Sequence, residues 1–145
     1  YLRSQSITEI DFKLSEEART VTRKILQSAS EKERGDLACT LVDELCDLAG
    51  IDIVNVKVSE ARQFHKKARG RTVYKRYGYY RPASRYIYIS NRTAVQGKIL
   101  APKSFLETLL HEWLHHYDYR RLNLNSIHTK GFYLRLGSLK EALLS

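Results

Sequence analysis

The chain has 145 residues, of which 43% are hydrophobic and 28% are charged. This length suits one compact domain, the composition excludes an intrinsically disordered chain, and no stretch approaches the ~20 consecutive apolar residues of a membrane span. Lys and Arg number 25 against 16 Asp and Glu, so the net charge at pH 7 is +9.

The positive charge is concentrated in the middle third of the chain. Residues 1–60 carry 8 basic and 12 acidic side chains, whereas residues 61–106 carry 12 basic and no acidic ones. Residues 107–145 are almost balanced, with 5 basic and 4 acidic side chains. Segregation of this kind predicts a surface for a polyanion, of which nucleic acid is the commonest.

The two cysteines predict a reducing environment. Cys39 and Cys46 lie seven residues apart in a predicted helix, and the corresponding rise of ~10.5 Å exceeds the ~7 Å limit between the Cα atoms of a disulfide. With no other cysteine, the chain has neither a disulfide framework nor a cysteine-based zinc site. We therefore expect a cytoplasmic location, or the nucleoid or nucleus if the protein associates with DNA.

The first fifty residues are predicted to be helical. Ser15 and two glutamates open one amphipathic segment, and a second segment carries leucine at positions 37, 41, 45 and 48. The second segment ends at Gly50, a residue type that commonly terminates helices. The β-branched run Ile51–Val58 then predicts a strand.

The basic section is predicted to contain a loop over residues 62–71 and strands over residues 72–80 and 85–90. In one interpretation, its basic side chains contact the phosphates of DNA, single-stranded or at a junction, and its tyrosines stack on unpaired bases. In the other, alternating Tyr and Arg simply solvate a half-exposed sheet. The lack of acidic residues favours nucleic acid, and the predicted contacts are Lys66, Lys67, Arg69, Arg71, Lys75, Arg76, Tyr77, Tyr79 and Tyr80.

Two further helices are predicted after the basic section. Ser104 and Glu107 form a capping-box pattern that opens a helix reaching Tyr117. Asn-rich residues 123–126 interrupt it, and a last helix follows with apolar residues from Phe132 to Leu143. The order of helices, strands and helices predicts one α+β domain over residues 1–145, with a mixed sheet of about three or four strands.

The predicted helix contains an H-E-x-x-H motif, His111-Glu112-Trp113-Leu114-His115. Residues four apart lie on one face of a helix, so both imidazoles can bind one metal ion. Glu112 projects beside that face, where it can accept a proton from water. Neutral imidazoles suit Zn²⁺, and a catalytic zinc site keeps one position open for water.

Two protein ligands are too few, so a third is expected downstream. His128 lies thirteen residues after His115, beyond the Asn-rich break, and is the preferred candidate. Asp118, which shares the helix face of the two histidines, and Glu141 on the last helix are the alternatives. His116 is offset by ~100° from His115 and should point away from the metal.

These residues resemble the SprT-like metalloprotease domain, the family that includes the Spartan proteases. The matching features are the strand Tyr86–Ser90, the helix segment 109–116, and His128 followed four residues later by Phe132. The resemblance covers residues 35–145, with residues 1–34 as an N-terminal helical extension, and its motifs fall within residues 84–136. Thr129 stands where the family usually has Gly, and the given sequence does not include the cysteines of the C-terminal zinc ribbon that many members carry.

The resemblance implies a zincin-like fold and a zinc-dependent endopeptidase. It also implies that His111, His115 and His128 hold Zn²⁺ and that Glu112 acts as general base and then protonates the leaving amine. Tyr133 and Arg135 are the candidate oxyanion donors. Zincins commonly bind substrate as an added strand at a sheet edge, and the segment 85–90 is a candidate for that edge, an interior position being the alternative.

Three functions follow as hypotheses. The first is an endopeptidase of DNA-associated or DNA-crosslinked proteins, because the eukaryotic members of the family cleave proteins crosslinked to DNA and are switched on by DNA binding. The second is a nucleic-acid-binding protein with a residual or structural zincin site. The third is a metallopeptidase that acts on a free regulatory protein, its charge serving solubility alone.

Overall fold

The computed structural model describes residues 1–62, 65–68, 71–75, 77–93 and 96–145, with backbone alone at positions 62, 65–68 and 71–75. The helices are α1 (Leu2–Ser6), α2 (Glu16–Ile25), α3 (Glu31–Ala49), α4 (Pro102–Arg120) and α5 (Lys130–Leu144). The strands are β1 (Asn55–Arg62), β2 (His65–Ala68), β3 (Arg71–Lys75), β4 (Gly78–Arg81) and β5 (Tyr86–Arg92). The predicted α+β class is confirmed.

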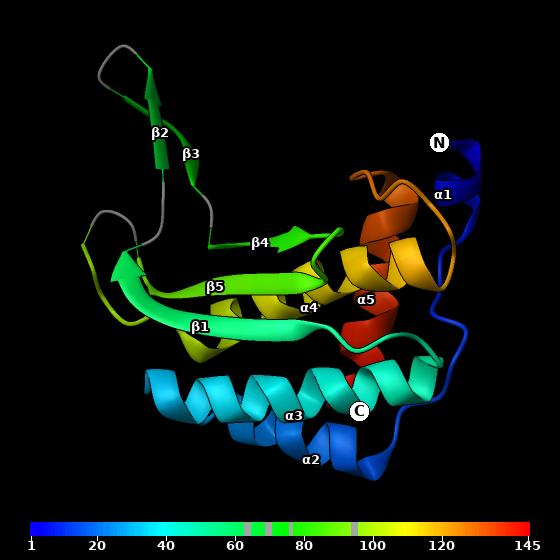
Figure 1. Cartoon of the computed structure of the whole chain (residues 1–145), viewed down its shortest axis with the longest axis horizontal. Helices are drawn as coiled ribbons and strands as arrows, with labels where there is room; N and C mark the ends of the chain where they lie inside the picture. The colour runs from blue at the N-terminus through cyan, green and yellow to red at the C-terminus, as the bar shows by residue number, and fades with distance from the viewer. Residues whose placement is uncertain (63–64, 69–70, 76, 94–95) are drawn as a thin grey trace.

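Among the described residues, the main sheet has three strands in the order β1-β5-β4. β5 pairs in parallel with β1 and antiparallel with β4, so the sheet is mixed, as predicted. β2 and β3 form a separate two-stranded antiparallel ribbon, which Figure 1 shows reaching away from the rest of the molecule. Because β5 is the middle strand, the candidate edge at residues 85–90 is wrong and the interior alternative holds.

Helices cover one face of the sheet. α4 packs against β4 and β5, and α3 packs against β1, so α4 lies behind the sheet in Figure 1. The strands direct Val58, Ile87 and Ile89 inward, where they join the fully buried Trp113 of α4 in one core. This packing fixes α4, the helix that carries the H-E-x-x-H motif, against the centre of the domain.

Local signals explain where the first helices begin and end. The side chain of Ser15 accepts a hydrogen bond from the backbone amide of Ala18 and caps α2. Gly50 adopts φ 69° at the end of α3, a left-handed conformation that costs glycine little. Both boundaries agree with the predictions from the sequence.

Other predicted boundaries are wrong. α4 begins at Pro102 rather than after Ser104, and the side chain of Ser104 does not cap it. Proline suits the first turn of a helix because its φ is already helical and its missing N–H would have no intrahelical partner there. The predicted loop at residues 62–71 contains β2, the predicted strand 72–80 divides into β3 and β4, and β1 begins only at Asn55.

None of the helices among the described residues combines the length and apolar character that a bilayer crossing requires. Both cysteines are free thiols, with Cys39 exposed and Cys46 buried.

Candidate metal centre

One face of α4 presents His111 and His115, and the connection after α4 brings His128 to them. The Nε2 atom of His128 lies 3.1 Å from Nε2 of His111 and 3.0 Å from Nε2 of His115. One ligand atom from each of the three histidines lies within 4.8 Å of the others. The structure therefore gathers the three predicted ligands so that their Nε2 atoms converge.

The two alternative third ligands lie elsewhere. Asp118 is fully buried and forms an ion pair of 2.9 Å with Arg135. Glu141 is exposed on α5, and neither residue belongs to the three-histidine group found among the described residues.

The environment of the cluster keeps its helix-borne histidines neutral. Burial, together with the neighbouring His128 ring, lowers the pKa of His111 to about 4. Burial, with the rings of His111 and His128, lowers the pKa of His115 to about 3. Since a metal ligand must offer an unprotonated nitrogen, these shifts suit metal binding near pH 7.

The ring of one phenylalanine packs against all three imidazoles. The ring of Phe132, fully buried at the start of α5, lies 5.1 Å from the ring of His111, 4.8 Å from that of His115 and 5.2 Å from that of His128, measured between centroids. Its packing limits how the imidazoles can rotate. The spacing of His128 and Phe132 at i and i+4 is the sequence signal for this contact.

His116 points away from the cluster, as predicted. Its Nε2 lies 2.7 Å from the backbone oxygen of Asp52, which can only accept, so Nε2 carries the hydrogen. Its Nδ1 then accepts from the hydroxyl of Tyr80 at 2.7 Å. His116 thus ties α4 to β4 and to the connection before β1.

Two cavities flank the histidine cluster, and Glu112 and His128 line both. One, of about 450 Å³, also includes Tyr77, Thr108 and Tyr133 in its wall. The other, of about 400 Å³, also includes Tyr80 and Tyr119. Glu112 is only 9% exposed, and because it lines both cavities it borders the space on either side of the cluster.

The two candidate oxyanion donors have different surroundings. Tyr133 is 52% exposed, and its ring centroid lies 5.8 Å from that of His128. Arg135 is fully buried and its guanidinium is bound to Asp118 and to backbone oxygens of the N-terminal segment. Tyr133 lines the cavity of about 450 Å³, whereas Arg135 lines neither of the two cavities.

The predicted nucleic-acid contacts are distributed over two regions. Lys66, Lys67, Arg71 and Lys75 belong to the β2–β3 ribbon, where the backbone alone is described. Arg69 and Arg76 lie outside the described residues.

The three tyrosines do not share one surface. Tyr77 and Tyr80 pack against the core on the side of α4. Tyr79 lies on the opposite side of the sheet, where its ring stacks on that of Tyr88 at 5.1 Å between centroids.

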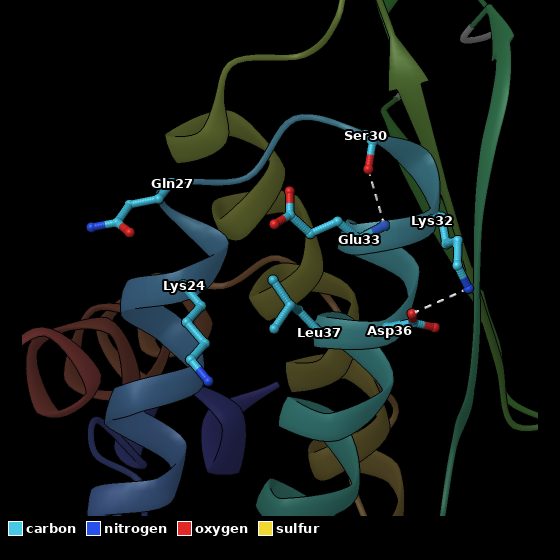
Figure 2. Close-up of a pocket in the computed structure, with 7 residues that line it drawn as sticks. All are labelled: Lys24, Gln27, Ser30, Lys32, Glu33, Asp36 and Leu37. Atoms are coloured by element: carbon cyan, nitrogen blue, oxygen red, sulfur yellow. Dashed lines mark hydrogen bonds and ion pairs between the residues drawn. The ribbon is translucent and has the colours of Figure 1, made fainter.

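A further cavity of about 520 Å³ lies between α2 and α3, distant in sequence from the histidines. Figure 2 shows that its lining comes from the end of α2, the following turn and the first turns of α3. Its polar side chains include an exposed i,i+4 pair, Lys32 and Asp36, 3.8 Å apart. Nothing in this lining has the convergence of donor atoms seen at the histidines.

One residue that contacts the cluster, Ser126, could not be identified from the sequence. The hydroxyl of Ser126 lies 2.6 Å from Nδ1 of His115. Ser126 lies in the segment interpreted as a break between helices, and a single serine in such a segment carries no signal for this contact.

No protein-family model matches the chain, and no curated protein or solved structure matches it either.

Proposed function

We propose that this chain is a zinc-dependent endopeptidase of the SprT-like type. The observation that carries the proposal is the convergence of three imidazole Nε2 atoms beside a glutamate that reaches the cavities on both sides. The donor set fits zinc, because Zn²⁺ favours neutral imidazole nitrogen and three such ligands leave a position open at a catalytic site. The fold class, α+β with the motif on a buried helix, is compatible with this function.

The chain's own residues have separable roles in this proposal. His111, His115 and His128 would hold the ion, which when bound lowers the pKa of water and polarises a peptide carbonyl. Glu112 accepts a proton from the attacking water and delivers it to the leaving amine. The hydroxyl of Tyr133, which lines one cavity, is the proposed donor to the oxygen of the scissile carbonyl.

The substrate would lie across the cluster from one cavity to the other. The walls on the sheet side come from the segment that includes β4, with Tyr77 in one cavity and Tyr80 in the other. Glu112 lines both cavities, so a peptide that extends from one cavity to the other would pass this residue. We therefore place an extended peptide, rather than a compact small molecule, in this site.

Nucleic acid is the proposed second partner. Residues 61–106 carry 12 basic and no acidic side chains, and part of this section forms the ribbon that reaches away from the body in Figure 1. A basic two-stranded ribbon can follow a phosphate backbone and bring DNA-bound proteins to the site. We propose that the ribbon recruits DNA-associated protein substrates.

The test is cleavage of a DNA-bound basic protein by the full chain, with and without single-stranded DNA. The matched variant is Glu112→Gln, with zinc content measured in both proteins so that lost activity is not confused with lost metal. DNA-stimulated cleavage that disappears in the variant would support the whole proposal. Cleavage that does not respond to DNA would retain the peptidase and remove the DNA partner, whereas a zinc-loaded chain without cleavage would contradict the peptidase.

A further inference from the structure

A buried ion pair lies directly behind the histidine cluster. Arg135 of α5 donates from Nε to Oδ1 of Asp118 at 3.2 Å and from the terminal nitrogen Nη2 to Oδ2 at 2.9 Å. Both side chains are 0% exposed. Removing two charges from water is costly, and a buried pair is often no more stable than apolar residues of the same size. A gain in stability therefore does not explain why this pair is buried here.

The pair continues to a metal ligand through one hydroxyl. Ser126 donates to Oδ2 of Asp118 at 2.8 Å, and the same hydroxyl oxygen lies 2.6 Å from Nδ1 of His115. A serine hydroxyl has one hydrogen, which here goes to the carboxylate, so its oxygen must accept from Nδ1–H of His115. The hydrogen of the neutral imidazole is then on Nδ1, and the lone pair on Nε2 faces the other two histidines.

Arg135 also reaches the neighbourhood of the third ligand. Its Nη1 donates to the backbone oxygens of Ser4 and Ile7, both at 2.7 Å. The hydroxyl of Ser4 is 2.8 Å from that of Thr129. Thr129 follows His128 directly and caps α5 by accepting from the amide of Phe132 at 3.1 Å. The guanidinium of Arg135 therefore binds Asp118, which is linked to His115 through Ser126. It also binds Ser4, which contacts the segment that bears His128.

We propose that Ser126, Asp118 and Arg135 are positioning residues of the metal centre. They fix the tautomer and the orientation of His115, and Arg135 also secures the N-terminal segment against the segment that carries His128. This proposal rests on the proposed function to the extent that the three histidines bind zinc. Loss of such an outer partner typically costs about 10- to 100-fold in metal affinity.

Ser126→Ala is the informative variant, because it leaves the buried Asp118–Arg135 pair in place and should fold. Ser126→Thr keeps the hydroxyl and serves as the conservative variant. Ser138→Ala is the matched control, since the Ser138 hydroxyl accepts from the amide of Ile10 in the N-terminal segment at 3.4 Å and lies on α5 without a part in the network.

The first measurement is the Zn²⁺ affinity of the full chain, by competition with a chromophoric chelator. We expect about 10- to 100-fold weaker binding in Ser126→Ala, near-normal binding in Ser126→Thr, and unchanged binding in Ser138→Ala. Equal affinity in Ser126→Ala and the unchanged chain would overturn the positioning role and leave the proposed function intact. An unchanged chain that binds no zinc would overturn both.

The second measurement uses no metal. Imidazole ¹⁵N chemical shifts of the metal-free chain report which ring nitrogen of His115 carries the hydrogen. We expect Nδ1–H in the unchanged chain and a mixture of tautomers in Ser126→Ala. An Nε2–H tautomer in the unchanged chain, or the same tautomer in both proteins, would overturn the proposal.

Discussion

The backbone oxygen of Ser4 lies against the Cα of Gly131, so close that a Cβ added there would be 1.9 Å from it. The amide of Gly131 also donates to the side-chain oxygen of Gln5 at 3.1 Å. The N-terminal segment is thus seated on the first turn of α5, immediately after the segment that bears His128. Any larger residue at position 131 must therefore move the N-terminal segment away from α5.

Gly131→Ala should therefore destabilise the protein, although alanine is normally the better helix former. We expect a loss of about 1–3 kcal/mol in the free energy of unfolding, the usual cost of overpacking. Gly137→Ala in the same helix is the control, because a Cβ there meets no atom within 4 Å, and it should stabilise by about 0.5–1 kcal/mol. Urea denaturation of both variants measures the difference, and equal effects would contradict the packing of Ser4 on α5.

Two aspartates that pair with arginine should respond very differently to replacement. Asp118 and Arg135 are fully buried, so Asp118→Ala leaves a buried guanidinium without its counter-ion and should cost about 3–5 kcal/mol. Asp52 pairs with Arg85 and Arg120, but its side chain is 47% exposed. Asp52→Ala should leave the unfolding free energy nearly unchanged, because solvent screens such pairs.

Thermal unfolding of the two metal-free variants provides the measurement for the aspartates. A large loss in Asp118→Ala with little change in Asp52→Ala is the expected result. Comparable losses in both variants would mean that the Asp118 pair is not shielded from water as the structure has it.

The thiols offer a chemical check of the packing of α3. Cys46 is 1% exposed and accepts from Nε1 of Trp113 at 3.3 Å, whereas Cys39 lies on the exposed face. Burial raises the pKa of both thiols, so neither should be unusually reactive at neutral pH. At pH 8 to 9 in a thiol-titration assay, about one thiol should react in the native chain and the second only after unfolding. Cys39→Ser should remove the native reaction, and rapid labelling of that variant would contradict the burial of Cys46.

Local signals in the sequence were sufficient for part of the fold. Ser15 and Gly50 act within their own helix, and the alternation in Tyr86–Ile89 reflects one face packed on α4, so each could be interpreted without knowing the rest of the chain. The division of residues 72–80 between two sheets could not be predicted, because the pairing of strands depends on residues far apart in the sequence. The position of β5 as the middle strand has the same origin.

The candidate site likewise has residues that the sequence could predict and residues that it could not. The i,i+4 spacing of His111 and His115 is a property of one helix, and His128 could be preferred because it lies beyond a break in that helix. The roles of Asp118 and Arg135 could not be predicted, since charged residues are almost always exposed and nothing local marks these two as buried partners. Arg135 was expected near the substrate because it lies close to His128 in sequence, but the helical turn directs it toward Ser4.

Zinc should stabilise the folded chain only while all three histidines are present. A ligand that binds the native state at 100 times its dissociation constant contributes about 2.7 kcal/mol, which corresponds to a rise of roughly 8 °C in Tm for a domain of this size. His128→Ala should abolish most of this rise, because the remaining two ligands come from one helix. Its effect on the metal-free chain should be small, since His128 is exposed.

The control is Glu112→Gln, which keeps the three imidazoles and should retain the full shift in Tm while losing any peptidase activity. Differential scanning fluorimetry with and without Zn²⁺, after treatment with a chelator, measures all three proteins under one condition. If the shift in Tm persists in His128→Ala, zinc either binds at another site or has a different group as its third ligand. Loss of the shift in Glu112→Gln would instead mean that the carboxylate holds the ion, which would leave the chain without the general base that peptide hydrolysis at this site requires.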